Sequence, residues 1–208
     1  MTRQYSNEVP SDWQKSISNY AGRTLPSVDR VAGVMVLLAP GEHGLDVLFT
    51  QRALDLNSHP GEVSFPGGNV EPEDIDLYAT ALRETQEEVG LTDQPVRLGR
   101  LDALYARSGI LVEPHVAWLD QKPMLQACPD EVAEIFWVPL SELFSRPPEY
   151  QLFERNGRHW RVPFFYYGPW KIWGMTGMIT VNLINVIWQQ AWPSFHEEWG
   201  KNPMDDNA

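Results

Sequence analysis

Cysteine is nearly absent from this chain of 208 residues. Cys128 is the single cysteine, so the chain has no partner for an internal disulfide and no set of thiolates for a zinc cluster. This scarcity fits a reducing compartment, and we expect a cytoplasmic location. The sequence places no base beside Cys128, which we therefore interpret as an inert thiol rather than a nucleophile.

Basic residues are also scarce. The chain carries 16 lysines and arginines against 28 aspartates and glutamates, which gives a net charge of −12. Nucleic-acid binding depends on a basic surface, so we expect no nucleic-acid partner. Small phosphorylated substrates are not excluded, because a bound divalent cation reverses the local charge.

Long apolar runs and targeting signals are missing too. Residues 1–29 show none of the features of a signal peptide. The most apolar segment, Trp173–Trp188, is shorter than the roughly 20 residues needed to span a bilayer, and Asn182 and Asn185 interrupt it. We therefore expect no membrane span. We interpret the segment as a core helix that could also support a homodimer.

The chain has enough apolar residues for one globular domain. Its hydrophobic content of 43% is typical of a folded core, and no repeat or linker divides it. We expect an N-terminal extension at 1–30, a domain at 31–200 and a flexible tail at 201–208. A short peripheral helix is expected near Asp12–Tyr20.

An acidic stretch near the middle of the chain predicts a helix with three carboxylates on one face. Glu84, Glu87 and Glu88 are spaced i, i+3 and i+4, which spans about 100° of a helix surface. Arg83 lies one turn before Glu87 and can pair with it, and Gly90 is placed to end the helix. The opposite side, expected to face a core, consists of Tyr78, Ala81, Leu82, Thr85 and Val89.

Such a concentration of carboxylates is unfavourable unless a cation binds there. Each exposed like-charge pair costs roughly 0.2–0.5 kcal/mol. Hard oxygen ligands suit Mg²⁺ or Mn²⁺, which also bind substrate phosphates. The alternative is a solvated acidic helix face. The preceding Phe65-Pro66-Gly67-Gly68 favours the metal site, since a glycine pair allows the backbone to approach a ligand closely.

The order of strand, Gly-Gly, acidic loop, helix and glycine resembles the box of the Nudix hydrolases, G-x5-E-x7-R-E-U-x-E-E-x-G-U. The matching residues are Gly68, Arg83, Glu84, Glu87, Glu88, Gly90 and Leu91. Two positions depart from the pattern: the lone acidic residue falls at Asp74, one residue too far from Arg83, and Thr85 replaces an aliphatic residue. The resemblance implies a fold of the α/β (α+β) class, in which a mixed β-sheet lies between α-helices. It also implies metal-dependent hydrolysis of a small-molecule diphosphate.

Residues Leu56–Gly68 narrow the resemblance. They are similar to the L-x-x-H-x-G-x-V-x-F-P-G-G signature of coenzyme A pyrophosphatases, as are Thr50–Arg52 before them and the W-G-x-T element at Trp173–Thr176. The extra residue in the box also resembles this subfamily. The resemblance implies that coenzyme A or its thioesters are cleaved to 3′,5′-ADP and 4′-phosphopantetheine or its acyl form.

The resemblance also implies roles for individual residues. Glu84, Glu87, Glu88 and a carbonyl of Gly67 or Gly68 would bind the metal. Arg83 would orient Glu87, and Glu84 would accept the proton of the attacking water.

Further roles in substrate and metal binding remain open. Arg52, His59 and Gly67 are candidate substrate contacts. Arg52 could equally form a surface salt bridge, and His59 could be an ordinary loop histidine. Glu131 or Glu134 could add an acidic ligand, or both could be surface carboxylates.

Two other functions remain open at this point. Another nucleoside diphosphate derivative, such as ADP-ribose, NADH or a damaged nucleotide, could be the substrate. A non-catalytic nucleotide-binding module is the second alternative, although it would have no need of three glutamates.

Alternating apolar residues predict the remaining elements. Strands are expected at Val31–Leu38, Leu45–Arg52, Val96–Tyr105, Ile110–Leu119, from Ile135 and at Trp160–Tyr167. The first two should form a hairpin across a turn at Pro40–Gly44, and a short helix should begin at Ser141. Ala106–Gly109 is expected to face the substrate. Asn156-Gly157 should form a hairpin tip, and Trp188, Trp192 and Trp199 should pack in the core or at a dimer contact.

Overall fold

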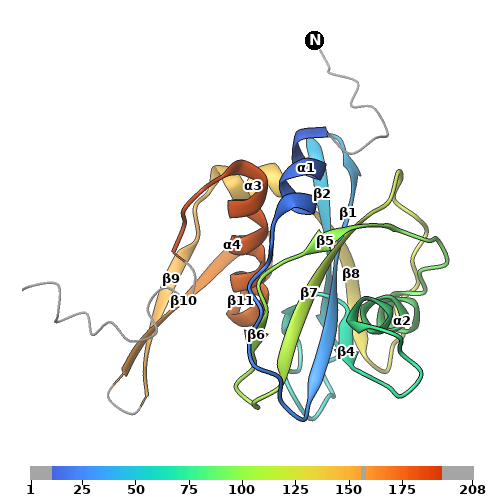
Figure 1. Cartoon of the computed structure of the whole chain (residues 1–208), viewed down its shortest axis with the longest axis horizontal. Helices are drawn as coiled ribbons and strands as arrows, with labels where there is room; N and C mark the ends of the chain where they lie inside the picture. The colour runs from blue at the N-terminus through green and yellow to red at the C-terminus, as the bar shows by residue number, and fades with distance from the viewer. Residues whose placement is uncertain (1–10, 156–157, 194–208) are drawn as a thin grey trace, which may run out of the picture.

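A large mixed sheet forms the centre of the protein. The computed structural model describes residues 11–155 and 158–193 (Figure 1). The strands of this sheet are β1 (Val31–Gly41), β2 (Gly44–Arg52), β3 (Val63–Ser64), β4 (Gly67–Asn69), β5 (Val96–Arg100), β6 (Leu104–Tyr105), β7 (Leu111–Trp118) and β8 (Val132–Pro139). Its main path runs β3-β2-β1-β7-β5. β1 and β7 are parallel and the other neighbours antiparallel, so the sheet is mixed.

A smaller sheet and four helices complete the described fold. The small sheet has the order β11-β10-β9 and consists of β9 (Glu149–Arg155), β10 (Arg158–Tyr167) and β11 (Trp170–Trp173). The helices of the described segments are α1 (Ser11–Asn19), α2 (Leu77–Val89), α3 (Leu140–Ser145) and α4 (Gly174–Trp188). None of these helices is long and apolar enough to cross a membrane.

The two faces of the large sheet carry separate apolar clusters. Alternate residues of β1 point to opposite faces, so Met35 packs with Ala81 of α2 while Val36 packs with Leu183 of α4. Figure 1 shows α2 on one side of the sheet and α1 and α4 on the other. The arrangement confirms the expected mixed sheet between helices.

Helix α2 forms where the sequence predicts it. The Asp76 carboxylate accepts a hydrogen bond from the Ala79 N–H at 2.8 Å and caps the first turn. Gly90 ends the helix in the left-handed region, at φ 66°, and donates to the Gln86 carbonyl at 3.0 Å. The predicted core side is confirmed: Ala81, Thr85 and Val89 are buried, and Tyr78 and Leu82 pack beside them.

Several expectations about the elements need correction. Helix α1 is not peripheral, because Ile17 is fully buried in the core on the α4 side of the sheet. The expected strand at Val96–Tyr105 is two strands, β5 and β6, separated by residues 101–103. The β1–β2 turn is tighter than expected, because Gly41 already pairs with Gly44. β8 begins at Val132, before the expected Ile135.

Other expectations are confirmed or fall outside the described residues. The C-terminal apolar segment is helix α4, and Trp188 packs in the core against Phe144, with ring centroids 4.6 Å apart. β9 and β11 were not expected from the sequence. The Asn156-Gly157 tip, Trp199 and the tail at 201–208 lie outside the described residues.

Candidate active site

A glycine pair brings the backbone against the acidic helix. β4 pairs with β1 so that Gly67 lies opposite Val34 and Gly68 opposite Gly33. Gly67 has φ 152°, and a Cβ there would lie 2.4 Å from the Gly33 carbonyl oxygen. A Cβ on Gly68 would lie 2.3 Å from an oxygen of Glu84. Position 67 therefore requires glycine, and the Glu84 carboxylate lies directly against the Gly68 backbone.

Glu88 is the most sheltered carboxylate of the α2 acidic face. Its side chain is buried, and Oε2 accepts a hydrogen bond from the Gly67 N–H at 3.3 Å. Burial is the main cause that raises its pKa to about 8, and the negative charges of Glu84 and Glu131 add to the shift. Burial also raises the pKa of Glu84, although the nearby Arg83 charge opposes that shift. Both carboxylates thus lie in surroundings that disfavour their charge.

Arg83 holds the acidic loop and the helix together. Its Nη1 donates to Glu84 Oε1 and to Glu87 Oε2, each at 3.1 Å, which confirms the predicted pairing with Glu87. Its Nε and Nη2 bind the two oxygens of Asp74 at 3.1 Å, and Nη2 also donates to the Asn69 carbonyl at 3.0 Å. The guanidinium therefore fixes both the carboxylates and the end of the glycine backbone.

Asp74, which departs from the expected spacing, has a clear structural role. Its two oxygens receive the Arg83 guanidinium in a fork arrangement, and the Glu71 N–H and the Thr80 hydroxyl donate to Oδ2. The Arg83 guanidinium is the main cause that lowers the pKa of Asp74 to about 2. The extra loop residue is thus accommodated without loss of the acidic partner of Arg83.

Arg52 and His59 occupy different surroundings. Arg52 ends β2, and its positive charge lowers the pKa of Glu88, which places it on the carboxylate side. Within the described segments, its Nε is buried and has no hydrogen-bond partner. The His59 side chain is 67% exposed, and its Nδ1 lies 2.9 Å from a carboxylate oxygen of Glu62. Arg52 thus has a buried donor without a partner in the described segments, whereas the His59 ring bonds Glu62 on its own loop.

The structure separates Glu131 from Glu134. The negative charge of Glu131 contributes to the raised pKa of both Glu84 and Glu88, so it lies on their side. Glu134 instead accepts a hydrogen bond from the Trp170 indole at 3.2 Å. Trp170 stacks on Phe136 at 4.1 Å and packs with the α4-side core, on the other face of the sheet. Glu131 is therefore the better-placed additional carboxylate.

The oxygen atoms near Gly67 and Gly68 fit a hard divalent cation. No three carboxylate, imidazole or thiol groups converge as a ready cage within residues 11–155 and 158–193. Glu84 and Glu88 nevertheless flank the glycine backbone. Burial chiefly raises the pKa of Glu88 and repulsion from Glu84 adds to it, and a bound cation would relieve that repulsion. Glu87 is 60% exposed and turned to Arg83.

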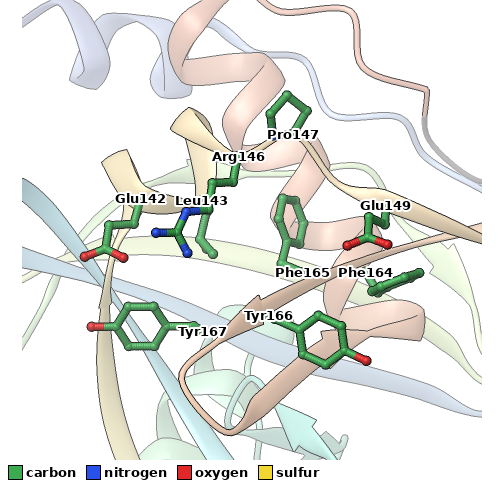
Figure 2. Close-up of a pocket in the computed structure, with 9 residues that line it drawn as sticks. All are labelled: Glu142, Leu143, Arg146, Pro147, Glu149, Phe164, Phe165, Tyr166 and Tyr167. Carbon is green, nitrogen blue, oxygen red and sulfur yellow. The ribbon is translucent and has the colours of Figure 1, made fainter.

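A cavity of about 210 Å³ lies elsewhere, between α3 and β10 (Figure 2). It is lined by Glu142, Leu143, Arg146, Pro147, Glu149, Phe164, Phe165, Tyr166 and Tyr167. It shares no residue with the carboxylate cluster. The candidate active site is therefore the surface around Glu84 and Glu88, where the charged groups converge, and not this cavity.

Comparison with known proteins identifies the family. Residues 29–160, more than half of the chain, match the model of the NUDIX domain.

The chain belongs to the Nudix family. It is a Nudix hydrolase, a diphosphatase acting on small-molecule diphosphate substrates, and members of the family typically depend on a divalent metal.

Two relatives illustrate the similarity of this Nudix hydrolase to other proteins. It is 44% identical over 143 residues to the uncharacterized Nudix hydrolase NudL of Photorhabdus laumondii, covering 68% of this chain and 76% of that protein. It is 45% identical over 118 residues to the peroxisomal coenzyme A diphosphatase ndx-8 of Caenorhabditis elegans, covering 55% of this chain and 50% of that protein.

A solved structure supports the Nudix fold. The crystal structure of a MutT/nudix family protein from Enterococcus faecalis matches with a TM-score of 0.51 and 20% identity, covering 86% of this chain and 71% of that chain. At this identity the likeness concerns the fold alone.

Proposed function

We propose that this Nudix hydrolase cleaves the diphosphate bond of coenzyme A or its thioesters, with Mg²⁺ or Mn²⁺ as cofactor. The products would be 3′,5′-ADP and 4′-phosphopantetheine or its acyl form. The observation that carries the proposal is that the Leu56–Gly68 segment, which resembles coenzyme A pyrophosphatases, ends on the carboxylate cluster, where Gly67 donates to Glu88. The likeness to the nematode coenzyme A diphosphatase supports the same substrate.

The residues around the glycine pair would hold the metal. Glu84, Glu88 and a carbonyl of Gly67 or Gly68 are the proposed ligands, and Glu87 joins them while Arg83 fixes its carboxylate. A bound Mg²⁺ or Mn²⁺ would lower the pKa of a water molecule and neutralise phosphate oxygens.

A carboxylate of the protein would accept the proton of the attacking water. The water oxygen forms a bond to phosphorus as the bond from phosphorus to the bridging oxygen breaks. Glu84 would accept the proton of the water, with Glu131 as the alternative base on the same side of the sheet.

Arg52 is the proposed phosphate contact with the strongest structural support. It lies near Glu88, and its buried Nε lacks a partner within the described segments, so a phosphate oxygen could satisfy it. His59 would contact a more distant part of the substrate, since its ring is exposed and bound to Glu62.

A substrate panel tests the proposal. Coenzyme A, an acyl thioester, dephospho-coenzyme A, ADP-ribose and NADH would each be incubated with Mg²⁺ or Mn²⁺, and the products separated by chromatography. We expect the highest kcat/KM for coenzyme A or its thioester, with 3′,5′-ADP as a product.

The other outcomes separate the alternatives. A preference for ADP-ribose or NADH would overturn the substrate while leaving the diphosphatase activity in place. Nucleotide binding without turnover of any compound would favour a non-catalytic module.

A further inference from the structure

The Trp173–Thr176 element joins the end of the small sheet directly to α4. Gly174 has φ 63°, a left-handed conformation that strains other residues, and it is the first residue of the helix. β11 therefore ends at Trp173 and α4 begins at the next residue, with no linker between them. This abrupt change of direction places Thr176 in the first turn of α4, at a position buried against the large sheet.

Thr176 connects α4 to the segment that leads into the glycine pair. Its hydroxyl donates to the Val63 carbonyl at 2.9 Å, across 113 positions of the chain. Both residues are buried, so water cannot readily replace this bond. The bond acts on β3, a strand of two residues that ends only shortly before Gly67.

Short backbone pairing with β2 and several side chains hold β3 in place. Thr50 and Gln51 lie opposite Ser64 and Val63 in the ladder. The Arg52 N–H donates to the Glu62 carbonyl at 3.0 Å. On β2, the Thr50 hydroxyl bonds the Ser64 carbonyl at 3.2 Å, and the Gln51 amide donates to the Gly61 carbonyl at 3.2 Å. Thr176 holds the same short segment from α4. A two-residue strand has little backbone pairing of its own. We therefore expect the loss of one of these side-chain bonds to shift the backbone from Val63 toward Gly68.

The same segment positions the groups proposed to hold the metal. After Ser64, the Pro66 carbonyl accepts from the Met35 N–H at 2.8 Å, and the Gly67 N–H then reaches Glu88. Gly68 follows, in contact with Glu84. A shift of the Val63 carbonyl would be transmitted over a few residues of extended backbone to the glycine pair.

We propose that Thr176 is a positioning residue for the divalent cation site. Its hydroxyl fixes Val63 so that the Gly67 and Gly68 backbone faces Glu84 and Glu88 at the separation that the cation needs. The inference rests on the proposed function in one respect only, that these glutamates bind a divalent cation.

Matched variants of one helix test the proposal. Thr176→Val keeps the shape of the side chain and removes the donor, while Thr176→Ser restores the hydroxyl. Thr180→Val is the control, because Thr180 is also buried in α4 but donates at 2.8 Å to the Thr176 carbonyl of its own helix. Mn²⁺ binding is measured directly, by titration of the electron paramagnetic resonance signal of the free ion.

We expect the Mn²⁺ dissociation constant of Thr176→Val to rise about three- to tenfold. This is less than the roughly 10- to 100-fold loss of metal affinity typical when a group that bonds a metal-ligating residue directly is removed. Thr176→Ser should bind within about twofold of the wild type, and Thr180→Val should bind like the wild type. Hydrogen exchange of the Phe65–Asn69 amides should accelerate in Thr176→Val alone. Both valine variants should lose thermal stability, so binding is measured at a temperature where all are folded.

Several results would overturn the inference. If Thr176→Val bound Mn²⁺ as tightly as the wild type, or if Thr180→Val lost as much Mn²⁺ affinity as Thr176→Val, Thr176 would only stabilise the fold. A wild-type protein that does not bind Mn²⁺ would overturn the inference together with the proposed metal site. Intact Mn²⁺ binding with no cleavage of coenzyme A would overturn only the substrate.

Discussion

Helices α2 and α4 pack on opposite faces of one sheet, and the surroundings of their polar groups differ in how well they favour those groups. In α4, the Asn182 amide accepts from the Asp102 N–H at 2.9 Å and donates to the Tyr20 hydroxyl at 3.2 Å. Asn185 bonds both the N–H and the carbonyl of Trp192. In α2, burial and like charges raise the pKa of both Glu84 and Glu88.

The difference indicates that Asn182 and Asn185 of α4 serve stability, and we propose that the acidic face of α2 serves chemistry. Paired amides inside an apolar helix stabilise a single arrangement of the core. Partly buried like charges oppose folding unless something outside the chain neutralises them. We propose that this conflict marks the functional side of the sheet, and a divalent cation is the partner that would resolve it.

The largest expected effect is the loss of turnover in Glu88→Gln. The amide keeps the size of the side chain and removes a charged oxygen ligand, so kcat/KM should fall by at least about 1,000-fold. Steady-state rates with the preferred diphosphate substrate would measure the effect. Glu73→Gln is the control, because it removes an exposed carboxylate from the loop before the same helix. Activity of Glu88→Gln near that of the wild type would remove Glu88 from the site.

The sequence predicted α2 well because all its signals are local. The 3.6-residue spacing of Ala81, Thr85 and Val89 defines the buried side, and Gly90 ends the helix at a position where other residues are strained. The carboxylate face follows from the same period. The pairing of Arg83 with Glu87 was also predicted, since it needs only the helix geometry.

Features that depend on distant contacts could not be predicted. The break between β5 and β6 occurs where Leu101 and Ala103 donate to the carbonyls of Pro114 and Arg23, which local periodicity does not reveal. The burial of Ile17 also depends on elements far along the chain. β11 is only four residues long, too short for a periodic signal.

The choice between Glu131 and Glu134 was open for a related reason. Glu134 lies two residues before Phe136, so in a strand both point to the same face, the α4 side. The sequence predicted a strand only from Ile135 onward, which left Glu134 outside it. With β8 starting at Val132, the alternation alone assigns Glu134 to the face away from α2.

A second, smaller effect tests the α4 side of the comparison. Asn182→Ala should lower the free energy of unfolding by about 2 kcal/mol, because the Asp102 N–H and the Tyr20 hydroxyl lose a partly buried partner. Its kcat/KM should stay within about twofold of the wild-type value, since Asn182 bonds Asp102 and Tyr20 and none of the groups proposed to hold the metal. Urea denaturation with parallel rate measurements would show both.

The control for Asn182→Ala is Gln94→Ala, an exposed position where truncation should cost less than about 0.5 kcal/mol. A large loss of turnover in folded Asn182→Ala would break the proposed division of roles between Asn182 of α4 and the acidic face of α2.

The smallest expected effect is a pH-dependent change in the free energy of unfolding. The substitution Glu88→Gln in α2 should raise this free energy, whereas Asn182→Ala in α4 should lower it. The pKa of Glu88 is about 8 in the folded protein, against 4.5 for an ordinary glutamate. Protonated Glu88 therefore stabilises the fold fully below about pH 4.5, and that contribution disappears as the pH rises through 8. With chelator present, Glu88→Gln should be more stable than the wild type at pH 9, by on the order of 1–2 kcal/mol.

Urea denaturation from pH 5 to 9, with chelator and then with Mn²⁺, would measure this difference. Mn²⁺ should stabilise the wild type at pH 9 and have little effect on Glu88→Gln, because a cation that binds only the folded state shifts the equilibrium toward it. Glu73→Gln, at an exposed carboxylate in the loop before the same helix, is the control. If Glu88→Gln were instead less stable than the wild type in chelator at pH 9, the Glu88 charge would be satisfied by the protein alone. The contrast between α2 and α4 would then be wrong, since neither helix would need a partner from outside the chain.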